Sequence, residues 1–257
     1  MAGGRSGSQK TCPQLLHWFG PRGEGSRIGI TLRMKYGIPA LERRGDFVFG
    51  NPGMALRLIL IRHGDLGEGC RGRYIGRTDA PLSPEGRRQA KALAAPLAHL
   101  GEGRCLSSPL LRSRETAGLA LAGAQCGIDA DLREINFGRW EGMTFDEIAA
   151  ADRAAVDRWA ALEEGFAFPG GEGIGAFRGR IAAAAGRIAG GGSGTVVAFT
   201  HGGVIRLLIC HFLGLEARDY LLFDIGTASI TELRVEDGRG VLTRLNDRHH
   251  LEELRED

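Results

Sequence analysis

The stretch Leu56-Arg-Leu-Ile-Leu-Ile-Arg-His-Gly64 predicts a buried β-strand that ends in a cation, an imidazole and a glycine. Four consecutive apolar residues, 58–61, are typical of a strand that is covered on both faces. In an open α/β sheet, ligands bind just beyond the carboxyl ends of the strands. Arg62 and His63 at that position favour an anionic ligand, because arginine presents a rigid fork of donors to phosphate oxygens.

A second apolar run, residues 195–200, ends in the same way, at His201-Gly-Gly203. Helical patterns are expected at about 84–100 (with Pro96 as a kink), 109–124, 145–162, 176–189 and 203–213. Further strands are expected near 104–107, 128–132, 220–225, 228–235 and 241–246, and Asp237-Gly238 predicts a hairpin. Alternating strands and helices predict a three-layer α/β/α sandwich with a mostly parallel sheet of about six strands, at least one of them antiparallel.

The charge balance gives no sign of a macromolecular partner. The 257 residues include 33 basic and 31 acidic side chains, for a net charge of +2. We therefore expect neither nucleic-acid binding nor membrane adsorption. No run approaches the roughly 18 apolar residues of a membrane span. The five cysteines are widely spaced and form no Cys-x-x-Cys pair, so we expect no disulfide framework, no zinc site and a cytoplasmic location.

The first 53 residues differ from the rest of the chain, because they are rich in glycine, basic and without clear periodicity. They are interpreted either as a targeting segment or as a disordered or mis-assigned extension, since Met54 directly precedes the first core strand. The expected catalytic domain covers residues 54–248, and residues 249–257 form a polar tail.

Four segments that carry polar groups together resemble the histidine phosphatase superfamily, which has the phosphoglycerate-mutase-like fold. They are Arg62-His-Gly64, Ser108-Pro-Leu-Leu-Arg-Ser-Arg-Glu-Thr116, Glu134-Ile-Asn-Phe-Gly-Arg-Trp-Glu-Gly142 and His201-Gly-Gly-Val-Ile-Arg206. The segment 72–86 is similar to the family's substrate loop. The resemblance covers residues 56 to about 246, with the motifs in the family's order.

The resemblance implies a catalytic role for each matched residue. His63 would be the nucleophile and form a phosphohistidine, and Glu134 would act as general acid and then general base. Arg62, Arg112 and His201 would surround the phosphoryl group and balance its charge. No metal and no cofactor is expected, since arginine and histidine provide the electrostatic stabilisation.

Several positions leave alternatives open. Glu141 competes with Glu134 for the acid, and Arg114 with Arg112 for the phosphate ligand. Arg206 is interpreted as a structural anchor. In the substrate loop, contacts are assigned to Arg73, Tyr74 and Gly76.

The loop that follows Arg62-His-Gly64 departs from the family. The family often has Glu-Thr after this motif, whereas this chain has Asp65-Leu66, so Leu66 lacks a hydroxyl that could contact phosphate.

The implied substrate is a small phosphate ester. Tyr74-Ile-Gly-Arg-Thr-Asp-Ala-Pro-Leu82 and Phe137-Gly-Arg-Trp-Glu-Gly142 are most similar to α-ribazole phosphatases of cobalamin nucleotide-loop assembly. The alternatives are a broad-specificity sugar-phosphate phosphatase, a phosphoglycerate mutase, or a catalytically silent adaptor that binds phosphorylated ligands. The resemblance also allows a homodimer.

Overall fold

The computed structural model describes residues 55–98, 103–161, 163, 165–252 and 254. The strands are β1 (Leu56–Arg62), β2 (Gly103–Ser107), β3 (Gly127–Ile128), β4 (Gly194–Thr200), β5 (Ile230–Glu236) and β6 (Arg239–Asp247). The α-helices are α1 (Pro84–Ala92), α2 (Ala94–Leu97), α3 (Leu111–Ala120), α4 (Phe145–Ala151), α5 (Arg153–Ala160), α6 (Ile174–Gly190) and α7 (Gly202–Leu213).

The strands form one six-stranded sheet in the order β3-β2-β4-β1-β5-β6. The pairs β3–β2, β2–β4 and β4–β1 are parallel, whereas β1–β5 and the hairpin β5–β6 are antiparallel. The parallel register of β1 and β4 places Arg62 opposite Thr200. The next residue of each strand, His63 and His201, therefore lies at the same edge of the sheet, with ring centroids 5.2 Å apart.

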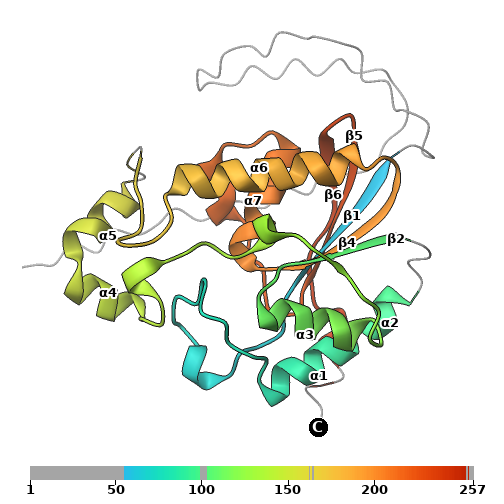
Figure 1. Ribbon diagram of the computed structural model, residues 1–257, viewed down its shortest axis with the longest axis horizontal. Coiled ribbons are helices and arrows are strands. Elements are labelled where there is room, and N and C mark those ends of the chain that lie inside the picture. The colour runs from blue at the N-terminus through green and yellow to red at the C-terminus, as the bar shows by residue number, and fades with distance from the viewer. Residues whose placement is uncertain (1–54, 99–102, 162, 164, 253, 255–257) are drawn as a thin grey trace, which may run out of the picture. The chain divides into compact units, whose positions relative to one another are not determined.

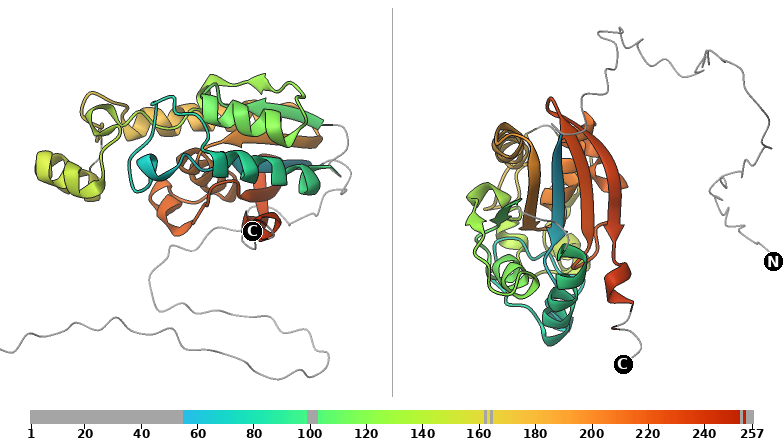
Figure 2. Two further views of the ribbon diagram at one scale, coloured as in Figure 1. Left: turned by 90° about the horizontal axis from the view of Figure 1, so that it is seen from below. Right: turned by 90° about the vertical axis from the view of Figure 1, so that its right-hand side faces the viewer.

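Both faces of the sheet are covered, as the sequence predicts. Leu58 and Leu60 pack into a core with residues of α6 and α7. Ile59 and Ile61, which point to the opposite face, pack with residues of α1, α2 and α3. Figure 1 shows α6 and α7 above the sheet and α1 to α3 below it, and Figure 2 shows the same layers from two other directions. The three-layer sandwich is confirmed.

The strand expected at 220–225 is wrong. Residues Ala217–Leu222 form a 3₁₀ helix, η4, which begins at a reciprocal capping box between Glu216 and Asp219. Leu221 and Leu222 are 64% and 76% exposed, so this apolar pair does not belong to a buried strand. Apolar runs of this length do not by themselves distinguish a strand from a helical turn.

Two expected helices are interrupted. The helix expected at 84–100 is divided at Leu93 into α1 and α2. The helical region expected from 145 to 162 is divided at Asp152, which has a non-helical backbone and ends α4. Four short 3₁₀ helices complete the fold, namely η1 (Glu68–Cys70), η2 (Ala130–Leu132), η3 (Gly138–Trp140) and η5 (His249–Leu251).

The extension expected at residues 1–53 lies outside the described residues. Among the helices of the described part, none combines the length and the apolar character that a membrane crossing requires.

Candidate active site

His63 is 5% exposed and lies directly after β1. Its Nδ1 lies 2.8 Å from the carbonyl oxygen of Gly64, which only accepts hydrogen bonds. Nδ1 therefore carries the proton, and the lone pair of the neutral ring is on Nε2. Burial, reinforced by the positive charges of Arg62 and Arg112, holds the pKa of His63 well below its usual value. The structure thus provides a neutral imidazole with Nε2 as its nucleophilic nitrogen.

His201 is fully buried and hydrogen-bonded through both ring nitrogens. The Nε of Arg112 donates to its Nδ1 at 3.2 Å, and its Nε2 lies 2.8 Å from the hydroxyl oxygen of Ser108. Because arginine can only donate, the neutral His201 ring is protonated on Nε2 and donates to Ser108. Burial, with the charge of Arg112 next, also holds the pKa of His201 well below its usual value.

Arg112 is completely buried at the start of α3. Besides His201, its guanidinium donates to the carbonyl oxygens of Thr78 (2.8 Å) and Gly76 (2.7 Å). This arginine therefore joins the end of β4 to the loop that contains residues 76–78. Arg114, its competitor in the sequence, is exposed.

Glu134 lies at the amino end of α7. One carboxylate oxygen accepts from the backbone N–H of Gly203 at 3.0 Å, and the other accepts from that of Ile135 at 3.0 Å. An anion is stabilised at this end of a helix. A Cβ atom at Gly203 would lie 2.5 Å from a Glu134 oxygen, so a larger residue here would displace the Glu134 carboxylate.

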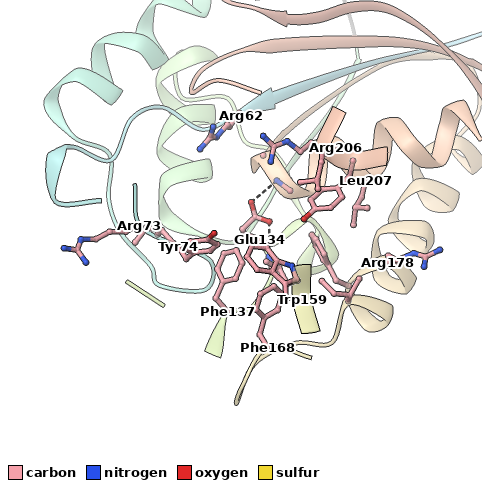
Figure 3. Close-up of a pocket in the computed structure, with 18 residues that line it drawn as sticks. Arg62, Arg73, Tyr74, Glu134, Phe137, Trp159, Phe168, Arg178, Arg206 and Leu207 are labelled. Carbon is pink, nitrogen blue, oxygen red and sulfur yellow. Dashed lines mark hydrogen bonds between the residues drawn. The ribbon is translucent and has the colours of Figure 1, made fainter. Parts of the chain in front are cut away.

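Arg62 and Glu134 both line a pocket of about 420 Å³, which Figure 3 shows. Gly202, Gly203, Arg178 and Arg206 also belong to the polar part of the wall. The remaining wall is mainly apolar and aromatic, and it includes Tyr74, Phe137, Trp159, Phe168, Phe177 and Tyr220. The rings pack edge to face, for example Tyr74 on Phe137 with centroids 5.1 Å apart. The pocket thus joins a charged end to an aromatic chamber.

The three residues of the predicted substrate loop have different surroundings. Tyr74 and Arg73 both line the pocket, and the Arg73 guanidinium extends outward from it in Figure 3 and pairs with Glu147 at 2.9 Å. The Gly76 N–H donates to Glu141 at 3.1 Å.

Glu141 holds this loop in place rather than lining the pocket. It accepts hydrogen bonds from the Thr78 hydroxyl (2.7 Å) and from the N–H groups of Gly76, Arg77, Thr78 and Phe137. Burial alone would raise the pKa of Glu141, but these hydrogen bonds outweigh it and lower the pKa. This geometry fits the interpretation of Glu141 as a structural carboxylate.

Sequence reasoning gave no role to Ser108 or, apart from Tyr74, to the aromatic wall. Ser108 begins the second arginine motif, but only the pairing of β2 with β4 brings its hydroxyl to His201. Trp159 and Phe168 carry no motif, and their aromatic character was the only signal in the sequence. Arg206, expected as an anchor, donates to the carbonyl oxygen of Phe223 at 2.8 Å and also lines the pocket.

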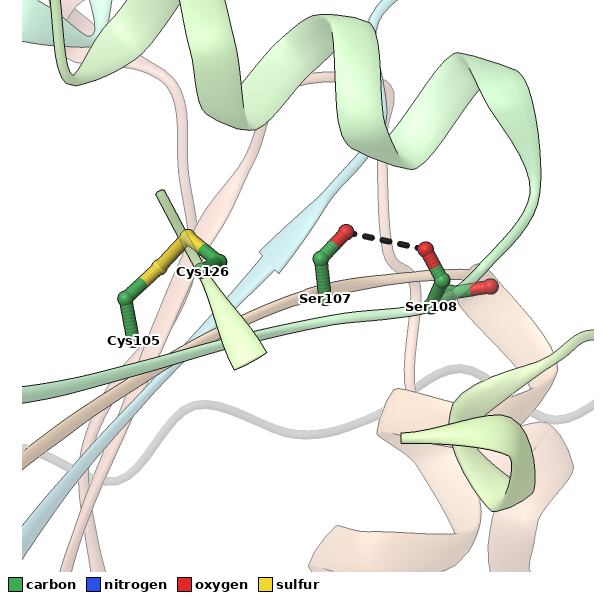
Figure 4. The surroundings of a disulfide bond; sticks show 4 residues. All are labelled: Cys105, Ser107, Ser108 and Cys126. Carbon is green, nitrogen blue, oxygen red and sulfur yellow. Dashed lines mark hydrogen bonds between the residues drawn. A yellow bond between two sulfur atoms is a disulfide. The ribbon is translucent and has the colours of Figure 1, made fainter. Parts of the chain in front are cut away.

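The expectation that the cysteines form no disulfide is wrong. Cys105 on β2 and Cys126 before β3 are joined, with Cα atoms 4.6 Å apart (Figure 4). The two positions are 21 residues apart in the chain, and the parallel pairing of Leu106 with Gly127 brings them together. The disulfide closes the segment that carries Ser108 and Arg112.

Within the described residues, no group of three or more His, Cys, Asp or Glu side chains is arranged to hold a metal ion.

Comparisons with known proteins find relatives of this chain among the phosphatases. Residues 58–248 match the histidine phosphatase superfamily (branch 1). The phosphoserine phosphatase 1 of Hydrogenobacter thermophilus is 32% identical over 203 residues, which cover 77% of this chain and 96% of the relative. The adenosylcobalamin/α-ribazole phosphatase of Salmonella typhimurium is 31% identical over 196 residues, covering 75% and 97%. The crystal structure of the α-ribazole phosphatase from Shigella flexneri superposes with a TM-score of 0.68 at 28% identity, covering 75% of this chain and 96% of that one.

Proposed function

Because the chain belongs to the histidine phosphatase superfamily and is a phosphomonoester hydrolase, we propose that His63 forms a phosphohistidine during catalysis. The observation that carries this proposal is the His63–Gly64 hydrogen bond, which fixes Nδ1 as the donor and leaves the Nε2 lone pair to attack. The low pKa of the buried ring keeps that lone pair free of a proton at neutral pH.

In the first step, Nε2 of His63 attacks phosphorus and the bond from phosphorus to the ester oxygen breaks. Glu134 in its carboxylic acid form gives its proton to the leaving oxygen, and the alcohol departs. In the second step, the Glu134 carboxylate takes a proton from water, whose oxygen attacks the phosphohistidine. Inorganic phosphate leaves and the electron pair of the N–P bond returns to Nε2. The position of Glu134 in the pocket wall supports this double role, and the Gly203 N–H stabilises the carboxylate that acts in the second step.

Arg62 and Arg112 supply the positive charge and the donors for the phosphoryl oxygens, and His201, the hydrogen-bond partner of Arg112, completes the phosphate-binding set. Arg62 reaches the pocket directly, and its buried Nε is without a hydrogen-bond partner among the described residues. Arg112 at present donates to the Gly76 and Thr78 carbonyl oxygens. We expect phosphate oxygens to replace these carbonyls, because an anion is the stronger acceptor.

For the alcohol half of the substrate, α-ribazole is the leading candidate, and its 5′-phosphate would be the substrate. The aromatic wall formed by Tyr74, Phe137, Trp159 and Phe168 supports this choice, because aromatic rings pack well against a planar benzimidazole base. Phosphoserine is the competing candidate, which the relative from Hydrogenobacter supports by its name. Its small charged half matches the apolar chamber less well.

The test is hydrolysis of a phosphate-ester panel in the presence of EDTA. The panel contains α-ribazole 5′-phosphate, phosphoserine, 3-phosphoglycerate and a sugar bisphosphate, each measured with the wild type, His63→Ala and Glu134→Gln. We expect α-ribazole 5′-phosphate to have the highest kcat/KM, with Glu134→Gln reduced about 10²-fold or more.

The outcomes separate chemistry from substrate. Equal, slow turnover of the whole panel that is still lost with His63→Ala would keep the mechanism and exclude α-ribazole specificity. A preference for phosphoserine would do the same. Activity that EDTA abolishes, or that survives in His63→Ala, would exclude the phosphohistidine mechanism.

A further inference from the structure

Arg180 of α6 lies against the backbone of the segment that carries Glu134. Its side chain is only 12% exposed. One terminal nitrogen donates to the carbonyl oxygens of Asp131 and Arg133, both at 2.6 Å. The other terminal nitrogen donates to the carbonyl oxygen of Glu134 itself at 3.1 Å. A single guanidinium therefore binds three carbonyl oxygens over four residues.

Glu172 holds this guanidinium from the other side. It accepts from Nε of Arg180 at 2.7 Å and from a terminal nitrogen at 2.9 Å, which is the bidentate geometry of a strong arginine–carboxylate pair. The same carboxylate accepts from the backbone N–H of Asn136 at 3.2 Å. Burial would raise the pKa of Glu172, but Arg180 outweighs it and the pKa is lowered, so the pair is ionised at neutral pH. The Phe177 ring lies 4.5 Å from the guanidinium carbon.

The segment needs such support because regular secondary structure does not fix it. The 3₁₀ helix η2 ends at Leu132, and Glu134 follows in irregular backbone. At the same time the carboxylate of Glu134 has little freedom, since it contacts the N–H of Gly203 at 3.0 Å. A displacement of about 1 Å at a catalytic group can cost about 10²-fold in rate.

We propose that Arg180, held by Glu172, is a positioning residue that places the Glu134 carboxyl where it can protonate the leaving oxygen. Arg180 does not line the pocket, and its hydrogen bonds to this segment all go to backbone carbonyl oxygens of residues 131–134. The proposal rests on the proposed function, in which Glu134 is the general acid.

The test compares two aryl phosphates that differ in their need for an acid. Phenyl phosphate releases a phenol with a pKa of about 10, like that of tyrosine, and depends on protonation of the leaving oxygen. p-Nitrophenyl phosphate releases a much weaker base, so its hydrolysis depends far less on protonation of the leaving oxygen. We use kcat/KM, because it reports the steps up to the first irreversible one and so includes phosphorylation of His63 but not hydrolysis of the phosphohistidine.

Arg180→Lys keeps a positive charge beside Glu172 but loses the planar guanidinium, which donates to Glu172 and to the backbone carbonyl oxygens at the same time. We expect kcat/KM for phenyl phosphate to fall about tenfold or more, and that for p-nitrophenyl phosphate to change by less than about threefold. The double variant Arg180→Met/Glu172→Gln removes the buried pair together and should show the same selective loss. Circular dichroism and an unfolding curve establish that each variant is folded.

Arg187→Gln is the matched control. Arg187 also lies on α6 and binds Asp129 and Asp131 of the same segment, but through their side chains and without contact to Glu134. The kcat/KM of this variant should stay within about twofold of the wild-type value for both substrates, because an exposed ion pair contributes little.

Suppose that Glu134→Gln shows the selective loss of kcat/KM for phenyl phosphate. If the folded Arg180 variants then lose kcat/KM equally for the two substrates, or lose none, the positioning role of Arg180 is overturned. If Glu134→Gln itself lowered kcat/KM equally for both substrates, the assignment of Glu134 as the general acid would fail, and the positioning role of Arg180 would fail with it.

Discussion

β1 and β4 are adjacent parallel strands that end in the same residue pair, His-Gly, yet their histidines have different hydrogen bonds. His63 binds the Gly64 carbonyl through Nδ1 and keeps the lone pair on Nε2. His201 accepts from Arg112 through Nδ1 and donates from Nε2 to Ser108. Both rings are buried, and both pKa values are lowered for the same reason, burial. Burial therefore does not distinguish the two residues.

What distinguishes them is the neighbouring strand. β4 pairs with β2, and the chain that leaves β2 supplies both Ser108 and Arg112. The other neighbour of β1 is β5, and the loop before it supplies only a backbone N–H, that of Ala228, to the His63 carbonyl oxygen. Two equal sequence patterns thus receive different chemistry from their places in the sheet. One imidazole is left as a nucleophile and the other is fixed as part of a hydrogen-bonded network.

Replacing each histidine should produce the largest effects and the sharpest contrast. His63→Ala removes the nucleophile, and we expect kcat to fall by about 10⁴-fold or more, with no phosphoenzyme after an alkaline quench, which preserves phosphohistidine. His201→Ala should lower kcat by about 10²-fold to 10³-fold, because it removes the ring that accepts from Arg112 and holds this arginine near the phosphoryl group. It should still form a phosphohistidine at residue 63, which peptide mapping by mass spectrometry locates. A phosphoryl group found on His201 would show that His201, and not His63, is the nucleophile.

The sequence predicted the parts of this arrangement that depend on local patterns. The buried strands, the His-Gly ends and the order of the motifs were readable from apolar runs and residue types. The parallel register then placed His63 beside His201.

The hydrogen-bonding states of the rings were not predictable, because they depend on Ser108 and on the strand order. The Cys105–Cys126 disulfide was not predicted, because it also depends on which strands are neighbours in the sheet. The turn at 217–222 was missed because two adjacent leucines fit a strand as well as an exposed 3₁₀ helix.

The shared property of the two rings, their lowered pKa, predicts a pH dependence of stability. In the unfolded chain a histidine titrates at about pH 6.5. In the folded protein His63 and His201 stay neutral to lower pH. Below about pH 6.5 the unfolded state therefore binds more protons, and the free energy of unfolding decreases as the pH falls, by up to about 1.4 kcal/mol per pH unit for each ring.

Urea unfolding at pH 7.5, 6.5 and 5.5 measures this dependence. We expect a combined loss of about 3 kcal/mol between pH 7.5 and 5.5. His63→Asn and His201→Asn should each remove part of it. Half-buried His250, whose pKa burial also lowers, contributes a remainder that survives in both variants. A stability that does not change over this range would show that these rings bind protons in the folded protein as they do in the unfolded chain.

The smallest effect should come from Ser108→Ala, and it tests whether the network around His201 matters for catalysis. The substitution leaves the Nε2–H of His201 with only the more distant Ser113 hydroxyl, at 3.4 Å. We expect kcat/KM to fall about fivefold, corresponding to about 1 kcal/mol for one lost hydrogen bond, while phosphorylation stays on His63. Ser107→Ala is the matched control, because this equally buried hydroxyl binds the Ser108 carbonyl oxygen and does not contact His201. If the two variants lose stability alike but only Ser108→Ala loses activity, the orientation of His201 contributes to the reaction. Equal activities would mean that Arg112 alone holds the ring, and the contrast between the two strand ends would then depend on one arginine.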